Sequence, residues 1–209
     1  DQVPPPSMST RADSRLERSP PSDTGRAALV IVDVQRDFCP GGALAAPGGE
    51  AIIDAVNRHI AEALAAGASV YVSRDWHPAV TTHFTAYGGE WPPHCVQGTR
   101  GAEFHAGMHL PPDAIVVSKG DDGATPGYSA FDGRTSTGVS LLDDLRARGI
   151  TRLQVCGIAT DYCVKHTVLD ARRAGLAVDV LRDATTGIDR EPGDVERAWE
   201  DMVAAGARL

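Results

Sequence analysis

Short apolar runs alternate with amphipathic segments along most of the chain, and no other feature of the sequence restricts the fold as strongly. The apolar runs have the length of strands, and most of the amphipathic segments end at a glycine, as helices do. We predict strands at 27–32, 69–72, 114–118, 152–157 and 177–181, and helices at 49–66, 139–148, 161–174 and 191–205. Strands and helices that alternate in this way form a mostly parallel sheet covered on both faces, a three-layer α/β/α, Rossmann-like architecture.

The first 25 residues lie outside this pattern. They are rich in proline, serine and charged residues, so we expect residues 1–25 to form a poorly ordered arm. The remainder, 26–209, has the length of a single domain. Within it, the segment 76–113 is irregular, and loops of this length in a compact domain are more often functional than idle.

Charge and cysteine content narrow the choice of partners and location. A net charge of −8 repels nucleic acid phosphates and anionic membranes, so neither is expected as a partner. No apolar run reaches the roughly 18 residues that indicate a membrane-spanning helix. The four cysteines form no CxxC pair and no secretory signal is present, which predicts reduced thiols and a cytoplasmic location.

Four residues with charged or nucleophilic side chains each follow an apolar strand: Asp33, Asp75, Lys119 and Cys163. In open parallel sheets the ligand crevice lies outside the carboxyl ends of the strands. The sequence therefore predicts two carboxylates, an amine and a thiol around one crevice, where Lys119 could pair with Asp33. Taken singly, Asp33 also suits an ordinary turn at a strand end, and Lys119 suits a solvated lysine.

Cys163 is the candidate nucleophile. Thr160 is a suitable N-cap, which would place Cys163 in the first turn of the following helix. There the free amides and the positive end of the helix dipole favour a thiolate. The alternative is a buried structural cysteine, a role that suits Cys156, inside its strand, better than Cys163.

One carboxylate and three imidazoles occur close together in the irregular segment and directly before it. They are Asp75, His77, His83 and His94. Such a set is typical of a site for a borderline divalent metal ion, and zinc, iron and manganese all tolerate it.

Three of the few aromatic residues fall in or beside the loops that carry these polar groups. They are Phe38, Trp91 and Tyr128. Aromatic walls around a few polar groups indicate a small-molecule pocket, although three unrelated core residues would give the same pattern.

The segments that carry these residues resemble the nicotinamidase branch of the isochorismatase-like cysteine hydrolases. The matching segments are DVQRDFCPGGALA, RDWHP, WPPHC, SKG and GIATDYCV, in order from about Ala27 to the C-terminus. GIATDYCV is specific to the superfamily. The DxH, THF and WPPHCVQGT elements together are specific to the nicotinamidase branch, because many relatives lack the metal.

The resemblance implies the isochorismatase-like hydrolase fold, with a sheet of five to six strands, and a set of site residues. The catalytic triad would be Asp33, Lys119 and Cys163. A cis peptide between Ile158 and Ala159 would turn the amides of Ala159 and Cys163 toward one point as an oxyanion hole. A divalent metal ion would be held by Asp75, His77 and His94, with His83 as a further ligand in some members. The substrate pocket would be formed by Phe38, Trp91, Tyr128 and Ile158.

The implied activity is hydrolysis of nicotinamide to nicotinate and ammonia through a thioester on Cys163, in NAD salvage, with pyrazinamide as a further substrate. The expected partner is thus a small molecule, and the sequence is compatible with a homo-oligomer. Two segments depart from the family. Residues 119–128 are slightly longer, which affects the pocket rim, and the chain stops at 206–209, where the family has a sixth strand, so that strand is shortened or its tail is absent.

Three other interpretations compete with this one. The first is a metal-independent relative that acts on isochorismate, biuret or a carbamoyl compound. The second is a hydrolase in which metal-bound water is the nucleophile and Cys163 is a bystander. The third is a ligand-binding module without activity, which would be expected to lose a triad residue.

Overall fold

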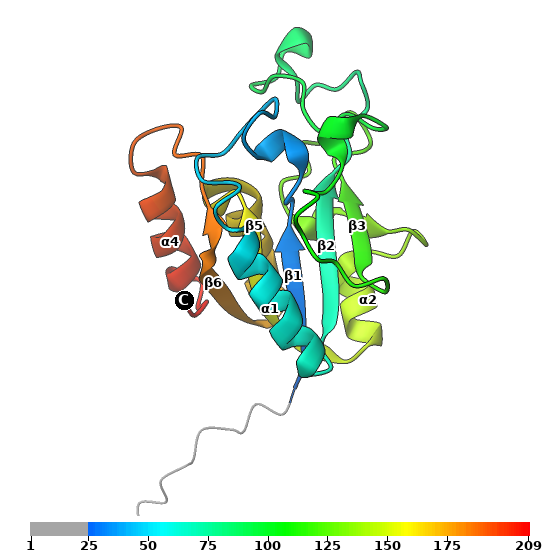
Figure 1. Cartoon of the computed structure of the whole chain (residues 1–209), viewed down its shortest axis with the longest axis vertical. Helices are drawn as coiled ribbons and strands as arrows, with labels where there is room; N and C mark the ends of the chain where they lie inside the picture. The colour runs from blue at the N-terminus through cyan, green and yellow to red at the C-terminus, as the bar shows by residue number, and fades with distance from the viewer. Residues whose placement is uncertain (1–24) are drawn as a thin grey trace, which may run out of the picture.

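A computed structural model describes residues 25–209 (Figure 1), so the predicted arm at 1–25 lies, apart from Gly25, outside the described residues. The strands are β1 (Arg26–Val32), β2 (Ser69–Asp75), β3 (Ile115–Lys119), β4 (Arg134–Thr135), β5 (Ile150–Ile158) and β6 (Ala177–Thr186). The α-helices are α1 (Ile53–Ala65), α2 (Leu141–Ala147), α3 (Lys165–Arg173) and α4 (Asp194–Ala204). Short 3-10 turns lie at Arg36–Phe38, Thr85–Tyr87, Arg100–Ala102 and Ala130–Asp132, and a π-helical turn at Thr160–Val164 precedes α3.

The six strands form one sheet in the order β4-β3-β2-β1-β5-β6. All neighbours pair in parallel except β3 and β4, which are antiparallel. The chain runs outward from β1 to β2 and β3, then crosses back to β5 and β6 on the other side of β1. The direction of winding therefore reverses between β1 and β5, and in such sheets a crevice opens at this point beyond the carboxyl ends of the strands.

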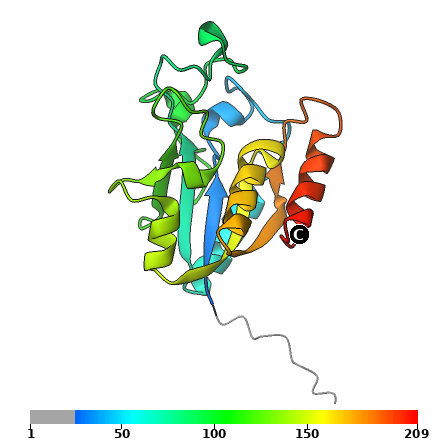
Figure 2. The ribbon, with the colours of Figure 1, turned by 180° about the vertical axis from the view of Figure 1, so that it is seen from behind.

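Strand β1 lies at the centre of the sheet and is buried on both faces. Ala28, Val30 and Val32 face one hydrophobic core, while Leu29 and Ile31 face the other. This arrangement explains why β1 is a continuous apolar run rather than an alternating one. Helix α1 covers one face of the sheet (Figure 1), and α2, α3 and α4 pack with the core of the opposite face (Figure 2). The predicted three-layer α/β/α architecture is confirmed.

The structure corrects several predicted boundaries. Strand β2 continues to Asp75, because the backbone of Asp75 pairs with that of Lys119 after the apolar side chains have ended. Strand β6 continues to Thr186 past an irregularity in its pairing with β5. The sixth strand of the sheet is the short β4, which precedes α2 in the chain and does not come from the C-terminus. Near the C-terminus, Arg208 makes a single parallel bridge to Asp179 of β6, so the pairing there is reduced to one residue.

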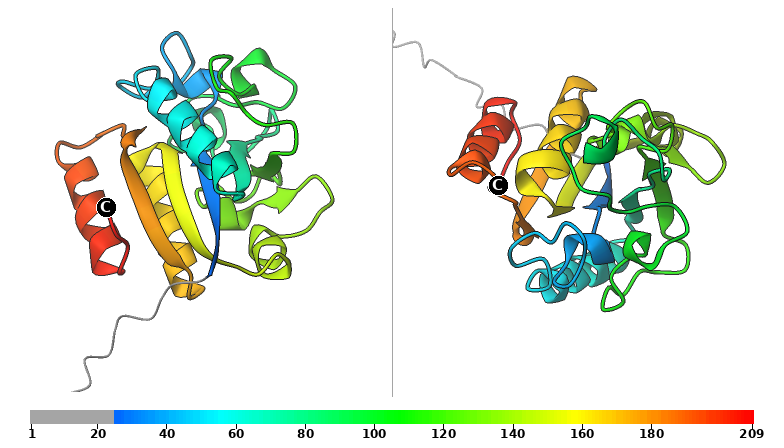
Figure 3. Two further views of the ribbon diagram at one scale, coloured as in Figure 1. Left: turned by 60° about the horizontal axis from the view of Figure 1, so that its bottom comes forward. Right: turned by 90° about the horizontal axis from the view of Figure 1, so that it is seen from above.

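The long connections gather beyond the carboxyl ends of the strands (Figures 1 and 3), where the segment between β2 and β3 holds only short 3-10 turns. The predicted irregular segment at 76–113 is therefore confirmed. Within the described part of the chain, no helix has both the length and the apolar character needed to cross a membrane.

Candidate active site

The four residues predicted at the strand ends meet around one ammonium group. The Nζ atom of Lys119 lies 2.7 Å from Oδ2 of Asp33, 2.5 Å from Oδ1 of Asp75 and 3.4 Å from Sγ of Cys163. Lys119 and Asp33 are fully buried, and Asp75 and Cys163 are nearly so. The alternatives of a solvated lysine and of an ordinary turn aspartate are thereby excluded.

Local backbone geometry directs Asp33 into this cluster. Asp33 directly follows β1 and has a φ of 50°, a left-handed conformation that is uncommon for a residue with a side chain. The hydroxyl of Ser73 on β2 donates to Oδ1 of Asp33 at 2.7 Å, and the amide of Asp33 donates to the carbonyl of Ser73 at 3.1 Å. These bonds leave Oδ2 of Asp33 directed at Lys119.

The carboxylates of Asp33 and Asp75 share the ammonium group of Lys119, but their surroundings shift their pKa values in opposite directions. Burial raises the pKa of Asp33 above its usual value, although Lys119 and the Ser73 hydroxyl oppose the shift. Burial acts on Asp75 as well, but Lys119 and the imidazoles of His77 and His94 outweigh it and hold the pKa of Asp75 well below its usual value. Asp75 is therefore the ionised partner of Lys119, and Asp33 is the group suited to accept and return a proton.

The segment that presents Cys163 is a π-helical turn that follows a cis peptide between Ile158 and Ala159. The predicted cis bond is confirmed. The amides of Tyr162 and Val164 both donate to the carbonyl of Ala159, at 3.1 and 3.0 Å, so the turn closes on Ala159. The predicted N-cap role of Thr160 is wrong, because its hydroxyl donates to Oγ1 of Thr185 on β6 instead.

The expected thiolate is not favoured in the free protein. Burial raises the pKa of the Cys163 thiol well above its usual value; Lys119 lowers it, while Asp33 and Asp75 raise it further. Cys163 lies in a π-helical turn and not in the first turn of α3, where the expectation placed it. This shift favours the thiol form, which a neighbouring base can deprotonate.

The predicted metal ligands lie beside this cluster and are buried. Ring nitrogens of His77, His83 and His94 lie within 4.8 Å of one another. Oδ2 of Asp75 is 3.5 Å from Nε2 of His77 and 3.7 Å from Nε2 of His94. Asp75 therefore contacts Lys119 through one carboxylate oxygen and the imidazoles through the other.

Hydrogen bonds to the far side of the rings set the tautomers. Nδ1 of His77 lies 2.9 Å from the carbonyl of Gly120, and Nδ1 of His94 lies 2.7 Å from the carbonyl of Pro92. Because a carbonyl only accepts, each Nδ1 carries a hydrogen, and Nε2 is the ring atom left to present a lone pair to a metal ion. Among the described residues, Nε2 of His77 is a buried atom without a hydrogen-bond partner. Burial, with help from His77 and His94, lowers the pKa of His83 to about 4, so the His83 ring is neutral near pH 7.

Buried lone pairs that face one another next to a carboxylate match the donors that a borderline divalent cation requires. The residues present therefore fit the metal ion that the sequence predicts. The chemistry of the set does not select among zinc, iron and manganese.

A small cavity of about 30 Å³ lies between the thiol and the imidazoles. It is lined by Phe38, Leu44, Asp75, His83, Trp91, His94, Tyr128, Ile158, Ala159, Tyr162, Cys163 and Ile188. All four predicted pocket residues are among them, and the Trp91 indole donates to the hydroxyl of Tyr128 at 2.9 Å. Leu44, Tyr162 and Ile188 also line the cavity and were not predicted from the sequence. Only Tyr162 had a signal, since it precedes Cys163.

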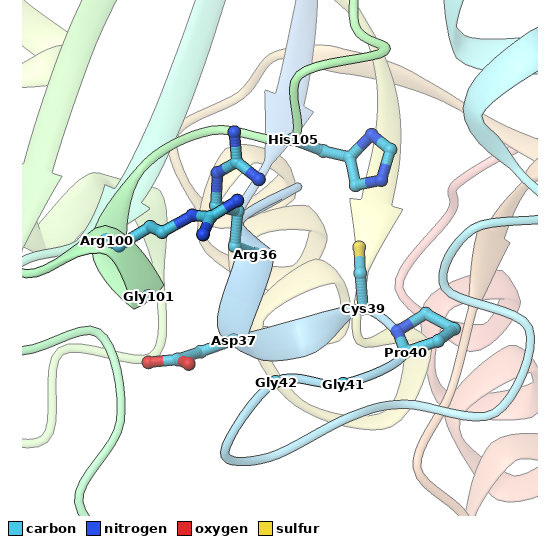
Figure 4. Close-up of a pocket in the computed structure, with 9 residues that line it drawn as sticks. All are labelled: Arg36, Asp37, Cys39, Pro40, Gly41, Gly42, Arg100, Gly101 and His105. Atoms are coloured by element: carbon cyan, nitrogen blue, oxygen red, sulfur yellow. The ribbon is translucent and has the colours of Figure 1, made fainter.

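A larger cavity, of about 390 Å³, lies elsewhere and contains none of the predicted site residues (Figure 4). Its charged lining is largely matched within the protein. Arg36 pairs with Glu103 at 3.1 Å, and the carboxylate of Asp37 accepts from the amides of Ala43 and Cys95. The candidate active site is therefore the small cavity, because it holds the clustered reactive groups.

Known proteins are similar to this chain over most of its length. The model of the isochorismatase domain family matches residues 27–209. The nicotinamidase of Escherichia coli is 42% identical, over 87% of this chain and 93% of its own length. The nicotinamidase/pyrazinamidase of Mycobacterium tuberculosis is 43% identical, over 87% of this chain and 97% of its own length.

A solved structure supports the same assignment. The pyrazinamidase of Pyrococcus horikoshii, crystallised in complex with zinc, superposes with a TM-score of 0.81 at 46% identity and covers 88% of this chain and 97% of its own. The family match spans every strand of the sheet from Ala27 onward and includes the buried lysine, carboxylates and thiol described above. The chain therefore belongs to the isochorismatase family.

Proposed function

We propose that the protein hydrolyses nicotinamide to nicotinate and ammonia, accepts pyrazinamide as well, and acts in NAD salvage. One observation carries the proposal: Lys119 joins Asp33 and Cys163 on one side and Asp75 of the imidazole cluster on the other, at the same small cavity. A thiol and a metal site around one cavity suit a ring carboxamide, whose amide carbon and ring nitrogen are two separate groups for them to contact. Relatives that bear the names nicotinamidase and pyrazinamidase support this substrate class.

The protein's own residues supply the acid–base chemistry. Asp33 accepts the proton of Cys163 as the sulfur attacks the carboxamide carbon, while Lys119 keeps the Asp33 carboxylate oriented. The amides of Ala159 and Cys163 stabilise the oxyanion, a contribution of about 2.7–4 kcal/mol per donor. Asp33 then gives its proton to the departing ammonia, and a thioester remains on Cys163. Water loses a proton to Asp33 and attacks the thioester; nicotinate leaves, and the sulfur regains that proton.

Asp75, His77, His83 and His94 would hold one divalent metal ion at the other end of the cavity. When bound, such an ion would act as a Lewis acid toward the ring nitrogen of the substrate. Zinc is the first ion to test, because the Pyrococcus relative was crystallised with it. Phe38, Trp91, Tyr128 and Ile158 would pack against the ring. All four cysteines are free thiols, which supports a cytoplasmic setting.

The direct test is ammonia release from nicotinamide by the wild type and by Cys163→Ala, with the metal content of each preparation measured. We expect rapid release by the wild type and none by the variant. The matched control is Cys39→Ala, which removes another buried thiol, one that does not line the cavity and whose pKa burial raises to about 11. Activity that survives in Cys163→Ala would refute the thioester route.

A second part of the experiment tests whether hydrolysis requires the metal ion. Treatment with a chelator should abolish hydrolysis, and zinc should restore it. Full activity in metal-free protein would instead indicate a metal-independent hydrolase of the same family. A metal-loaded wild type that leaves nicotinamide untouched would overturn the substrate assignment.

A further inference from the structure

Gln35 is a fully buried polar side chain that the reaction described above does not use. It lies two residues past Asp33, in the turn that leaves β1. A buried amide costs free energy unless its donors and its acceptor are hydrogen-bonded, so its partners indicate what it does.

Both ends of the Gln35 amide bind backbone groups of Asp75. Nε2 of Gln35 donates to the carbonyl of Asp75 at 2.8 Å, and the amide of Asp75 donates to Oε1 of Gln35 at 2.9 Å. A side-chain amide that accepts from the amide of one residue and donates to its carbonyl makes the same pair of hydrogen bonds as a residue of a neighbouring strand. Gln35 thus extends the pairing between β1 and β2 beyond the last residue of β1.

The second donor of Gln35 reaches the long loop. Nε2 also donates to the carbonyl of Ala102 at 3.0 Å, and the backbone of Gln35 forms an antiparallel bridge with Phe104. Both partners belong to the segment that carries His77, His83 and His94. One side chain therefore ties the end of the sheet, the carboxylate-bearing residue and the histidine-bearing loop together.

The position of Asp75 affects both the catalytic cluster and the imidazole cluster. Its carboxylate lies 2.5 Å from Nζ of Lys119 with one oxygen and within 3.5 to 3.7 Å of two imidazoles with the other. A shift of its backbone would alter both sets of contacts. We propose that Gln35 is a positioning residue that fixes Asp75 and the imidazole loop for metal binding, an inference that rests on the proposed function for the identity of the metal site.

The test compares the zinc affinity of metal-stripped wild type with that of Gln35→Met, measured by competition with a chromophoric chelator. Methionine has a similar length and cannot make the three bonds. Groups that hold a metal ligand in place typically contribute about 10- to 100-fold in affinity, so we expect zinc to bind that much more weakly. The kcat for nicotinamide should fall in the same variant.

The matched control is Gln97→Met. Gln97 donates to the carbonyl of Trp76, the residue next to Asp75, at 2.8 Å, but is exposed and does not touch Asp75. We expect its zinc affinity to stay at the wild-type value. Near-UV circular dichroism identifies variants that do not fold. If Gln35→Met is one of them, Gln35→Asn keeps the amide but shortens its reach, and should also bind zinc more weakly.

Wild-type zinc affinity in a folded Gln35 variant would overturn the proposal, as would an equal loss in Gln97→Met. The outcomes remain separate from those of the proposed function. A wild type that binds zinc but does not hydrolyse nicotinamide refutes the substrate and leaves the affinity comparison valid. A wild type that binds no zinc refutes the role assigned to Gln35.

Discussion

The ammonium group of Lys119 is fully buried between two carboxylates, so the fold depends on the balance of these charges. Removing one partner of a buried ion pair leaves uncompensated charge and costs about 3–5 kcal/mol. In Lys119→Met, two buried carboxylates would face each other without a cation. We therefore predict a loss of that size in the free energy of unfolding, measured by urea denaturation, together with loss of activity.

Two controls sharpen this prediction. Lys165→Met removes a lysine that is partly exposed and 3.4 Å from Asp201, and should change the free energy of unfolding by less than about 1 kcal/mol. Adding Asp33→Asn to Lys119→Met removes one of the two stranded charges and should recover part of the stability. If Lys119→Met had the free energy of unfolding of the wild type, Lys119 would not compensate the two carboxylates in the way the distances indicate.

The charged residues of the site could be predicted from the sequence, but the residues that position them through hydrogen bonds could not. Asp33, Asp75 and Lys119 could be found because each follows an apolar strand and bears a charge. Ser73 and Gln35 act through hydrogen bonds to a carboxylate and to backbone groups, and neither residue type marks such a role in one sequence. The only available signal for Gln35 was a polar residue between a buried strand and a turn.

At the scale of elements, a partly buried hydrogen bond joins strand β2 to helix α2. The hydroxyl of Tyr71 donates to Oδ2 of Asp144 at 2.6 Å, and Nε of Arg148 donates to the same oxygen at 2.8 Å. Partial burial alone would raise the pKa of Asp144, but these two bonds outweigh it and lower the pKa below its usual value. The carboxylate form is thus the one that the fold stabilises.

We predict that Tyr71→Phe costs about 1.5–3 kcal/mol at neutral pH, the range for a hydrogen bond to a charged group. A carboxyl whose folded pKa is depressed contributes stability above its usual pKa and loses it as the pH falls through the folded pKa. The difference between Tyr71→Phe and wild type should therefore shrink in acid. Urea denaturation across this range measures it, and Tyr87→Phe, at a half-exposed tyrosine, should show no difference at any pH. A cost that does not depend on pH would contradict the role of Asp144.

Element boundaries were predictable where side-chain pattern and backbone pairing end together. They coincide closely at β1 and β3, whose apolar runs stop at Asp33 and near Lys119. At β2 the side-chain pattern ends before the backbone pairing does: Arg74 and Asp75 end the apolar pattern, but their backbones continue to pair with β3. Strand β4 has only two residues and no apolar run, so no periodic signal could reveal it.

For the molecule as a whole, the active-site cavity is narrow. About 30 Å³ accommodates roughly one water molecule, far less than an aromatic carboxamide needs. The walls come from separate loops: Trp91 from the long segment after β2, Tyr128 from the segment after β3, and Ile188 from the connection between β6 and α4. We therefore expect these loops to move apart when an aromatic carboxamide binds.

The contacts that join the loops at the surface are weak enough to allow this movement. Arg190 lies 3.6 Å from Glu90 and its guanidinium carbon lies 5.3 Å from the ring centre of Trp91. Both charged side chains are substantially exposed, and exposed pairs of this kind contribute about 0–1 kcal/mol. Trp91 itself is only 6% exposed, so its surroundings must change when the loops separate around a ligand.

We predict that nicotinamide changes the tryptophan fluorescence of the Cys163→Ala variant, which binds substrate without turning it over, in a saturable manner. The change should be lost when Trp91→Phe is added, because Trp76 and Trp199 do not line the cavity. Calorimetry on both variants establishes that binding itself persists. Saturable binding with unchanged emission would contradict this prediction, because it would mean that the ring enters without a change in the surroundings of Trp91.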